Sequence, residues 1–415
     1  MTTTDRSRAS AGTFLPLALS ALVMFIDGYD LNAMPLVVPH LSEQLGAAPE
    51  DFGLALSAVL IGLGIGALFI APYGDRIGRR PMILASVGVM AVTTFGTATG
   101  GSISEFVLWR LGTGLGLGAC LPNVTALVAD LSPQLRRART LTLVSMGISF
   151  GGISAGILGP ILVEIGGWQA IFEFGAAATV ALLVALWFWL PEGAAKFDEE
   201  SSQAGVRGAQ GSSAFARLLK LPLLISTLLF AGLYAVNALV LYYIVSWVPT
   251  ILPEAGFTVA AAARFLSLIQ FGGLVVGLGL SFLLDRGLAV MAMVGTYACV
   301  VLALLALLLV PSGSAGWGVL LVVAGGGISA AHLAIMAVAI GFFPRDLLSS
   351  AIGIAVAVAR LGAVGGPLLG GMAIAAGAGP GTFFALAAIP AAICIAAACF
   401  IPTAQRAGQR AADAG

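Results

Sequence analysis

The chain has 415 residues, of which 59% are hydrophobic and only 9% are charged, and its formal net charge is zero. A soluble globular domain carries about 25% charged residues, so this composition excludes a water-soluble globule and predicts a multi-pass membrane protein. The balanced charge gives no indication of a nucleic-acid partner, and we expect none.

Twelve apolar segments are each long enough, at about 20 residues, to cross a bilayer as a helix. The first one is too long and too continuous to be a cleaved leader. We therefore predict an all-α integral membrane protein with spans at residues 14–38, 52–72, 81–100, 104–129, 140–163, 169–190, 223–250, 260–284, 288–310, 316–341, 347–373 and 380–401.

A polar segment at residues 191–220, rich in Gly, Ser and charge, separates the first six spans from the last six. We predict a linker there, between an N-terminal half at 14–190 and a C-terminal half at 221–402, with tails at 1–13 and 403–415. Landmarks recur about 210 residues apart, which indicates the internal duplication seen in many transporters. They are Asp75-Arg76 and Asp285-Arg286, Pro133 and Pro344, Gly159-Pro160 and Gly366-Pro367, and Pro191 and Pro402.

The distribution of Lys and Arg predicts the orientation in the membrane. If the N-terminus is cytoplasmic, 16 of the 19 basic residues fall in cytoplasmic tails, loops or the linker. Basic residues accumulate on the cytoplasmic side of membrane proteins. We therefore expect both termini and the linker in the cytoplasm.

Several polar side chains lie inside the predicted spans, where a charged group costs at least about 2.5 kcal/mol. Such groups almost always face the helix bundle or a wet cavity, so they are candidates for function. The stretch MFIDGYDLNAMP in the first span holds Asp27, Asp30 and Asn32. The others are Arg110 in the fourth span, His332 in the tenth and Arg360 in the eleventh.

The depths of these groups predict which of them meet. With a rise of about 1.5 Å per residue, Asp30 lies about 12 Å from the outer end of the first span and Arg110 about 10 Å from that of the fourth. Arg110 therefore matches Asp30 better than Asp27. A carboxyl group that gains and loses an ionic partner can bind and release a proton. Asp27 and Asp30 are thus candidates for proton coupling; the alternative is that one or both only hold the helices together.

The loop APYGDRIGRRP at residues 71–81 follows the second span. Gly78 permits a tight turn, and Arg76, Arg79 and Arg80 fit a cytoplasmic loop. Asp75 is not needed for topology, but an acid can cap a facing helix N-terminus and so latch two parts of the protein. The alternative is that the loop only signals topology.

These features resemble the major facilitator superfamily over nearly the whole chain. The resemblance rests on the twelve spans, the duplication, GDRIGRR, RLGTGLGLG in the fourth span and GISAGILGP in the fifth. DGYD in the first span and LPNVTALVADLSPQLRRAR after the fourth-span glycines further resemble the aromatic acid:proton symporter family.

The resemblance implies proton-coupled import of a benzoate-like or hydroxybenzoate-like anion by alternating access. It implies a monomer in the bacterial inner membrane, driven by the proton gradient without a cofactor. Functional roles would fall on Asp27, Asp30, Asp75, Gly78 and Arg110. Asp130 matches an acid that is usually Glu in the family, and Arg360 matches its eleventh-span arginine.

An aromatic carboxylate needs a cation and flat apolar walls. Arg110 or Arg360 can supply a bidentate guanidinium. Polar groups that can fix the substrate are Asn32, Asn123, Asn237, Gln270 and His332, and candidate walls are Tyr29, Phe230, Tyr234, Tyr242, Tyr243, Trp247 and Phe271. Trp247, near a span end, is also interpreted as an anchor at the membrane interface.

Other functions leave weaker signals in the sequence. A proton-coupled exporter of drugs or organic acids would carry the same charges, and sequence does not separate it from an importer. An enzyme is not expected, because His40 and His332 are the only histidines and lie in different halves, with no metal-ligand spacing. A sensor is not expected either, since the short tails hold no signalling domain.

Overall fold

The structure is a computed structural model that describes residues 3–134, 136–191, 216–221, 223–339, 343 and 347–406, with the backbone alone at 3–13, 138 and 349. Within these residues, twelve helices are long and apolar enough to cross a membrane, and all other ordered elements are short helical turns. The predicted fold class is confirmed. Most of the predicted linker (192–215), the chain ends (1–2 and 407–415) and Pro344 lie outside the described residues.

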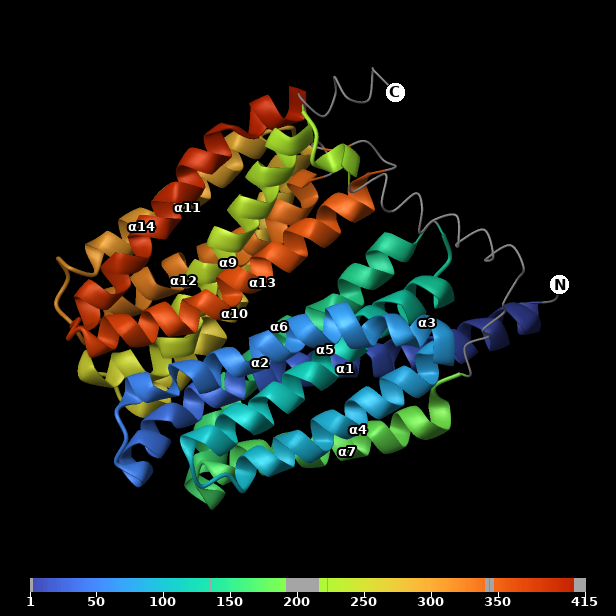
Figure 1. Ribbon diagram of the computed structural model, residues 1–415, viewed down its shortest axis with the longest axis horizontal. Helices are drawn as coiled ribbons and strands as arrows, with labels where there is room; N and C mark the ends of the chain where they lie inside the picture. The colour runs from blue at the N-terminus through green and yellow to red at the C-terminus, as the bar shows by residue number, and fades with distance from the viewer. Residues whose placement is uncertain are drawn as a thin grey trace. The chain divides into compact units, whose positions relative to one another are not determined.

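The described residues divide into two compact units, and the first contains six spans (Figure 1). Its elements are α1 (Thr3–Leu45), η1 (Pro49–Phe52), α2 (Gly53–Ile65), η2 (Gly66–Ile70), η3 (Ala71–Tyr73), α3 (Gly74–Ile77), α4 (Arg79–Ala98), α5 (Ile103–Leu131), α6 (Arg137–Gly166) and α7 (Gln169–Trp189). The second span runs from η1 to α3 and includes the π-helical turn η2. Val248–Thr250 and Thr258–Ser267 also belong to this unit.

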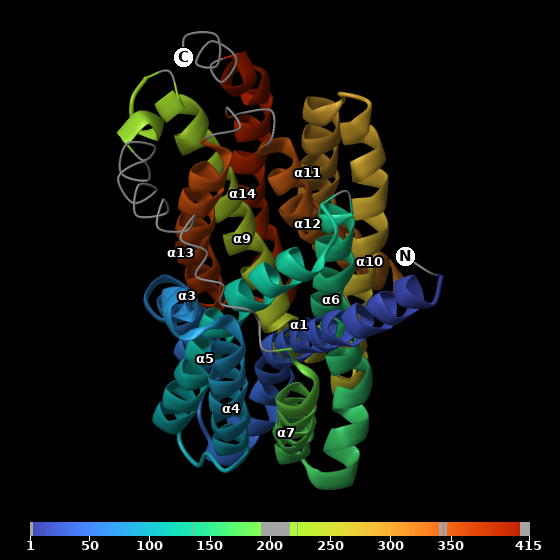
Figure 2. The same ribbon diagram turned by 90° about the vertical axis from the view of Figure 1, so that its right-hand side faces the viewer.

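The second unit contains the other six spans, apart from the segments of α9 and α10 just named. They are α9 (Leu223–Glu254), α10 (Val259–Asp285), α11 (Ala289–Ala306), α12 (Ala315–Ala339), α13 (Leu348–Ala375) and α14 (Pro380–Cys399). Within this unit α11 packs against α12 and α14 (Figure 1). In the first unit α4 packs against α5 and α7, as both views show (Figure 2).

Glycines allow the helices of each unit to approach closely. A Cβ on Gly28 of α1 would overlap the main-chain oxygen of Ile148 of α6, and one on Gly362 of α13 would overlap that of Ala235 of α9. Lipid gives no hydrophobic force between helices, so small residues that permit close packing stabilise the bundle. The glycines therefore fix the register that positions the polar side chains of α1 and α9.

The observed helix ends differ from the predicted ones at α1. This helix continues to Leu45, seven residues beyond the predicted end at 38, and it contains Pro35 and Pro39. Proline is tolerated in spanning helices because neighbouring groups satisfy the freed carbonyls. Asp30 therefore lies about 22 Å along the axis from the end of α1 rather than 12 Å.

Candidate functional site

The first unit holds a buried ion pair between α1 and α5. Arg110 Nη1 donates to Asp30 Oδ2 at 2.8 Å, and Nη2 donates to the main-chain oxygen of Asp30 at 2.9 Å. Arg110 is fully buried and Asp30 is 3% exposed. The pairing of Arg110 with Asp30, predicted from their depths, is confirmed.

Three neighbours hold this pair in place. Thr94 of α4 donates its hydroxyl to Asp30 Oδ1 at 3.3 Å, and the Arg110 guanidinium lies 5.9 Å from the ring centre of Phe172. Tyr29 donates its hydroxyl to the main-chain oxygen of Ile171 at 2.9 Å, which ties α1 to α7. The Asp30 carboxylate thus accepts hydrogen bonds from two helices, α4 and α5.

Asp27 and Asn32 lie on the same helix as Asp30. Asp27 is 2% exposed and lies near Cys120 of α5. Asn32 donates its Nδ2 to the Gly28 main-chain oxygen at 2.8 Å, and its Oδ1 is buried without a hydrogen-bond partner among the described residues. The first unit therefore offers two buried carboxyl groups and one open amide acceptor.

The loop motif adopts the tight turn that was predicted. Gly78 has φ +98° and ψ 145°, a backbone conformation that side chains disfavour, and it lies between α3 and α4. Arg79 forms an ion pair with Asp130 of α5, and Arg80 donates to the main-chain oxygen of Trp187 at 2.6 Å. These contacts tie the loop to the ends of α5 and α7.

Three other members of the predicted site lie in or beside this loop. Asp75 is exposed and has no hydrogen bond or ion pair with a described residue, so its latching role stays a prediction. Arg76 lies over the ring of Tyr73 at 5.6 Å. Asn123 donates to the main-chain oxygens of Ala71 and Ala119 at 3.1 and 2.9 Å. Asn123 therefore joins α5 to the loop, and the structure does not bring it to the ion pair.

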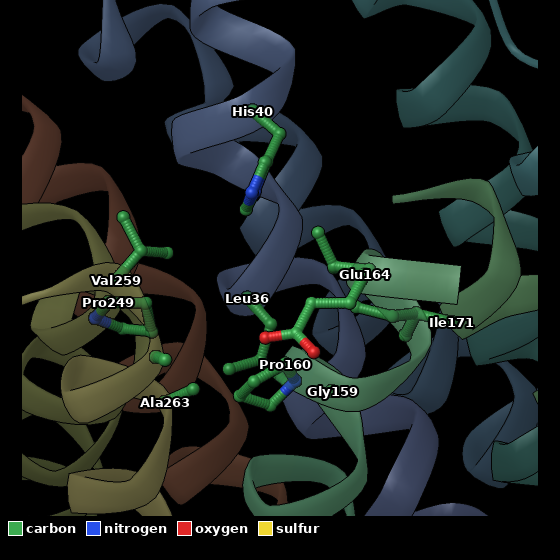
Figure 3. Close-up of a pocket in the computed structure, with 11 residues that line it drawn as sticks. Leu36, His40, Gly159, Pro160, Glu164, Ile171, Pro249, Val259 and Ala263 are labelled. Atoms are coloured by element: carbon green, nitrogen blue, oxygen red, sulfur yellow. The ribbon is translucent and has the colours of Figure 1, made fainter. Parts of the chain in front are cut away.

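A pocket of about 170 Å³ also lies in the first unit (Figure 3). His40 of α1 and Glu164 of α6 line it, together with Leu36, Gly159, Pro160, Val163, Ile171, Pro249, Val259, Ala260 and Ala263. The Nδ1 atom of His40 is buried without a partner among the described residues. This pocket was not predicted, because the apolar pattern ends the first helix before His40.

The second unit holds a separate polar cluster, built by α9, α11 and α12. Asn237 Nδ2 lies 2.9 Å from His332 Nδ1, and the Tyr297 hydroxyl donates to Asn237 Oδ1 at 2.9 Å. Asn237 and Tyr297 are fully buried, whereas His332 is half-buried. Tyr234 lies against the His332 ring, with the ring centres 4.6 Å apart.

Arg360 of α13 lies beside this cluster. Its charge acts on both Tyr234 and His332. It is half-buried and has no hydrogen bond or ion pair with any residue that the structure describes. Gln270 is half-buried and likewise has no hydrogen bond within the described residues, and Tyr242 interacts with Tyr234. The cluster thus combines an unpaired cation, an imidazole and an aromatic face.

The structure reduces the number of aromatic residues that are candidates for the walls of the substrate site. Tyr243 donates its hydroxyl to the main-chain oxygen of Phe383 at 3.0 Å, and Trp247 donates Nε1 to that of Pro367 at 2.9 Å. Trp247 is fully buried, so its interpretation as an interface anchor is wrong. Phe271 is 54% exposed. The candidate walls that remain in the second unit are Phe230, Tyr234 and Tyr242. The rings of Phe230 and Tyr234 are stacked, with their centres 6.4 Å apart.

Sequence reasoning missed two residues of these clusters. Tyr297 lies in the apolar run VGTYACVV and Thr94 in MAVTTFG, and neither has a charge or motif that marks it. A buried hydroxyl needs a partner, which is the only signal that either residue offers. Within the described residues, no three His, Cys, Asp or Glu side chains gather as metal ligands would.

The comparison with known families identifies the fold. The model of the Major Facilitator Superfamily matches residues 20–331, about three quarters of the chain. The chain belongs to the major facilitator superfamily. A solved member of similar fold is a bacterial homologue of the human lysosomal transporter Spinster, with a TM-score of 0.72 and 18% identity over 96% of this chain and 98% of that one.

Curated relatives extend the comparison to function. A gallate transporter from Pseudomonas putida is 30% identical over 409 residues, which cover 93% of this chain and 91% of the relative. A 3-(3-hydroxy-phenyl)propionate transporter from Escherichia coli K12 is 31% identical over 381 residues, 91% of each chain. The predicted resemblance to aromatic acid transporters is confirmed. This major facilitator protein is a multi-pass transporter and not an enzyme.

Proposed function

We propose that this major facilitator protein imports a hydroxylated aromatic carboxylate together with protons. Both relatives named above are transporters of aromatic acids that carry one carboxylate and at least one ring hydroxyl. Import by alternating access in the bacterial inner membrane, as a monomer driven by the proton gradient alone, is part of the same proposal.

The proposal rests on a difference between the two arginines that lie inside the spans: one has an anionic partner and the other has none among the described residues. Arg110 is fully buried and donates two hydrogen bonds to Asp30. Arg360 is half-buried and has no anionic partner among the described residues. A cation inside a span needs a counter-charge, and a carboxylate ligand supplies one. Arg360 therefore binds the substrate carboxylate, while Arg110 belongs to the proton site.

The walls of the substrate site come from the aromatic rings near Arg360. Tyr234 is parallel to Phe230 and lies against His332 at an interplanar angle of 31°, so these rings offer an aromatic surface for a substrate ring. Gln270 and Tyr242 supply further polar groups in the same unit. Aromatic faces with a few placed polar groups are typical of small-molecule sites.

The proton site is the carboxyl group of Asp30, with Asp27 one helical turn away as its relay. A proton that binds Asp30 removes the charge that Arg110 Nη1 contacts. The Nη2 bond to the main-chain oxygen of Asp30 does not depend on that charge, so Arg110 stays in place while the ion pair is lost. Protonation thus changes the contact between α1 and α5 without expelling either side chain.

Uptake into proteoliposomes tests the proposal. We expect an inside-alkaline pH gradient to drive accumulation of labelled 4-hydroxybenzoate by the unmodified protein. In Asp30→Asn the gradient should lose its effect, while exchange of substrate continues. Asp51→Asn is the matched control, because Asp51 is exposed and only caps η1. Accumulation by Asp30→Asn as strong as that of the control would contradict the coupling role.

The same vesicles separate import from the alternative of export. An exporter that exchanges substrate for protons would be driven by the opposite gradient. If the labelled substrate accumulates under an inside-acid gradient and not under an inside-alkaline one, the protein is an antiporter and the proposal of symport is wrong.

A further inference from the structure

The polar cluster of the second unit is a directed chain of hydrogen bonds. The Tyr297 hydroxyl donates to Asn237 Oδ1, and Asn237 Nδ2 contacts His332 Nδ1, both at 2.9 Å. An amide oxygen only accepts and an amide nitrogen only donates. His332 Nδ1 must therefore accept, which in a neutral imidazole places the proton on Nε2.

The second neighbour of Tyr297 supports this direction. Cys394 of α14 lies within hydrogen-bond range of the Tyr297 hydroxyl. If the Asn237 amide were turned over, its nitrogen would face Tyr297, and the tyrosine proton would have only the thiol as acceptor. Sulfur is a weak acceptor, and a buried donor without a good partner is costly. The orientation with Oδ1 toward Tyr297 satisfies both side chains.

The same arrangement opposes a charged imidazole. A proton on Nδ1 would point at the amide hydrogens of Asn237 across 2.9 Å. The charged and titratable groups that face His332 are Arg360 of α13 and Tyr234 of α9, with Tyr297 of α11 acting through Asn237. None of them is an acid that would stabilise an imidazolium, and the Arg360 charge repels one.

We propose that Tyr297 and Asn237 are positioning residues that hold His332 neutral, with its Nε2–H as a hydrogen-bond donor to an oxygen of the substrate. Nε2 has no hydrogen bond with any side chain or carbonyl that the structure describes. The Tyr234 ring, which lies against His332 at an interplanar angle of 31°, restricts the plane in which this donor points. His332 then recognises the substrate and does not carry the coupled proton; the identity of the ligand rests on the proposed function.

Nitrogen NMR tests the protonation state without any transport assay. The chain has two histidines, so protein labelled with ¹⁵N-histidine gives two sets of ring signals, and the set lost in His332→Gln belongs to His332. We expect Nδ1 to have the shift of an unprotonated nitrogen and Nε2 that of a protonated one. In Asn237→Asp the carboxylate accepts instead, so Nδ1 should become protonated. A protonated Nδ1 in the unmodified protein would overturn the inference.

Binding and coupling in His332 variants test the role. The glutamine amide reaches the place of Nε2, whereas the asparagine amide reaches only that of Nδ1. We expect His332→Asn to bind 4-hydroxybenzoate at least about tenfold more weakly, the equivalent of one hydrogen bond, and His332→Gln to stay within about threefold. Benzoate has no ring hydroxyl, so its binding shows which substrate oxygen accepts from Nε2–H. If the carboxylate accepts, His332→Asn should weaken benzoate binding as much as 4-hydroxybenzoate binding. If the ring hydroxyl accepts, benzoate binding should be unchanged. Equal binding of 4-hydroxybenzoate by both variants would overturn the role.

Glutamine does not titrate, so His332→Gln should keep uptake driven by the pH gradient. Loss of the gradient effect with binding intact would make His332 the proton carrier and overturn the proposal. If the unmodified protein shows no proton-driven uptake of any aromatic acid, the proposed function fails, while the NMR result still decides the state of His332.

Discussion

Asp30 and Arg110 form a buried ion pair in which the guanidinium contacts both the carboxylate, at 2.8 Å, and the main-chain oxygen of the same residue, at 2.9 Å. The second contact makes the position of Arg110 independent of the charge on Asp30. A pair of this kind can lose its charge without losing its geometry. That property suits Asp30 to the proton site of the proposed function.

Removal of Arg110 alone should destabilise the protein strongly. Arg110→Ala leaves a buried carboxylate without its counter-charge, which typically costs about 3–5 kcal/mol. The double variant Asp30→Asn/Arg110→Ala removes the stranded charge and should recover much of the loss. The unfolding midpoint of the purified protein measures both, and the two single changes complete a cycle. Strictly additive losses would show that the two side chains are not coupled.

Replacement of Arg360 should weaken substrate binding rather than folding. It is half-buried and has no partner within the described residues, so Arg360→Gln breaks no internal ion pair. A hydrogen bond to a charged group contributes about 1.5–3 kcal/mol, so affinity for 4-hydroxybenzoate should fall about 10- to 150-fold.

Thermal stabilisation by the ligand measures that affinity, because a ligand bound only to the folded state raises the unfolding midpoint. Arg264→Gln is the matched control, since Arg264 is exposed near the start of α10. Stabilisation of Arg360→Gln equal to that of the control would remove Arg360 from the substrate site.

The extent of sequence-based prediction differs between the two clusters. The pair of Asp30 and Arg110 was predictable because both residues are charged and both lie inside apolar spans. Their predicted depths agreed only because the first span was ended at residue 38; with α1 continuing to Leu45, helical rise alone does not match the two depths. The chain of Tyr297, Asn237 and His332 was not predictable, although two of its members were named as candidates. Its residues are 60 and 95 positions apart, and their register depends on how three helices pack.

Helix α1 shows a second limit of sequence reasoning. Pro39 and His40 resemble a helix end in water, so the predicted span stopped at residue 38, but the helix continues to Leu45. In a helix bundle, other groups bind the carbonyls that proline leaves without a hydrogen bond, so the helix continues past Pro39. The pocket at His40 and Glu164 depends on this extension, and for that reason it was missed.

The turn at Gly78 should be sensitive to any side chain. Its φ of +98° and ψ of 145° disfavour a Cβ, so Gly78→Ala should lower the free energy of unfolding by about 1–3 kcal/mol. Gly88→Ala is the control, because Gly88 is helical and a Cβ there would meet only Leu183, at 3.8 Å. The unfolding midpoints should separate the two variants; a loss of equal size in both would mean that the turn conformation is not the cause.

The ion pair between Arg79 and Asp130 should affect transport more than stability. Both side chains are partly exposed, at 28% and 61%, and such pairs contribute only about 0–1 kcal/mol. We expect Asp130→Asn to slow uptake of 4-hydroxybenzoate severalfold while the unfolding midpoint stays nearly unchanged, because the loop is then no longer held to the end of α5. The charge exchange Arg79→Asp/Asp130→Arg restores the attraction and should restore the rate. If the exchanged variant is as slow as Asp130→Asn, the individual residues and not their pairing control the rate, and Asp130 acts through another contact.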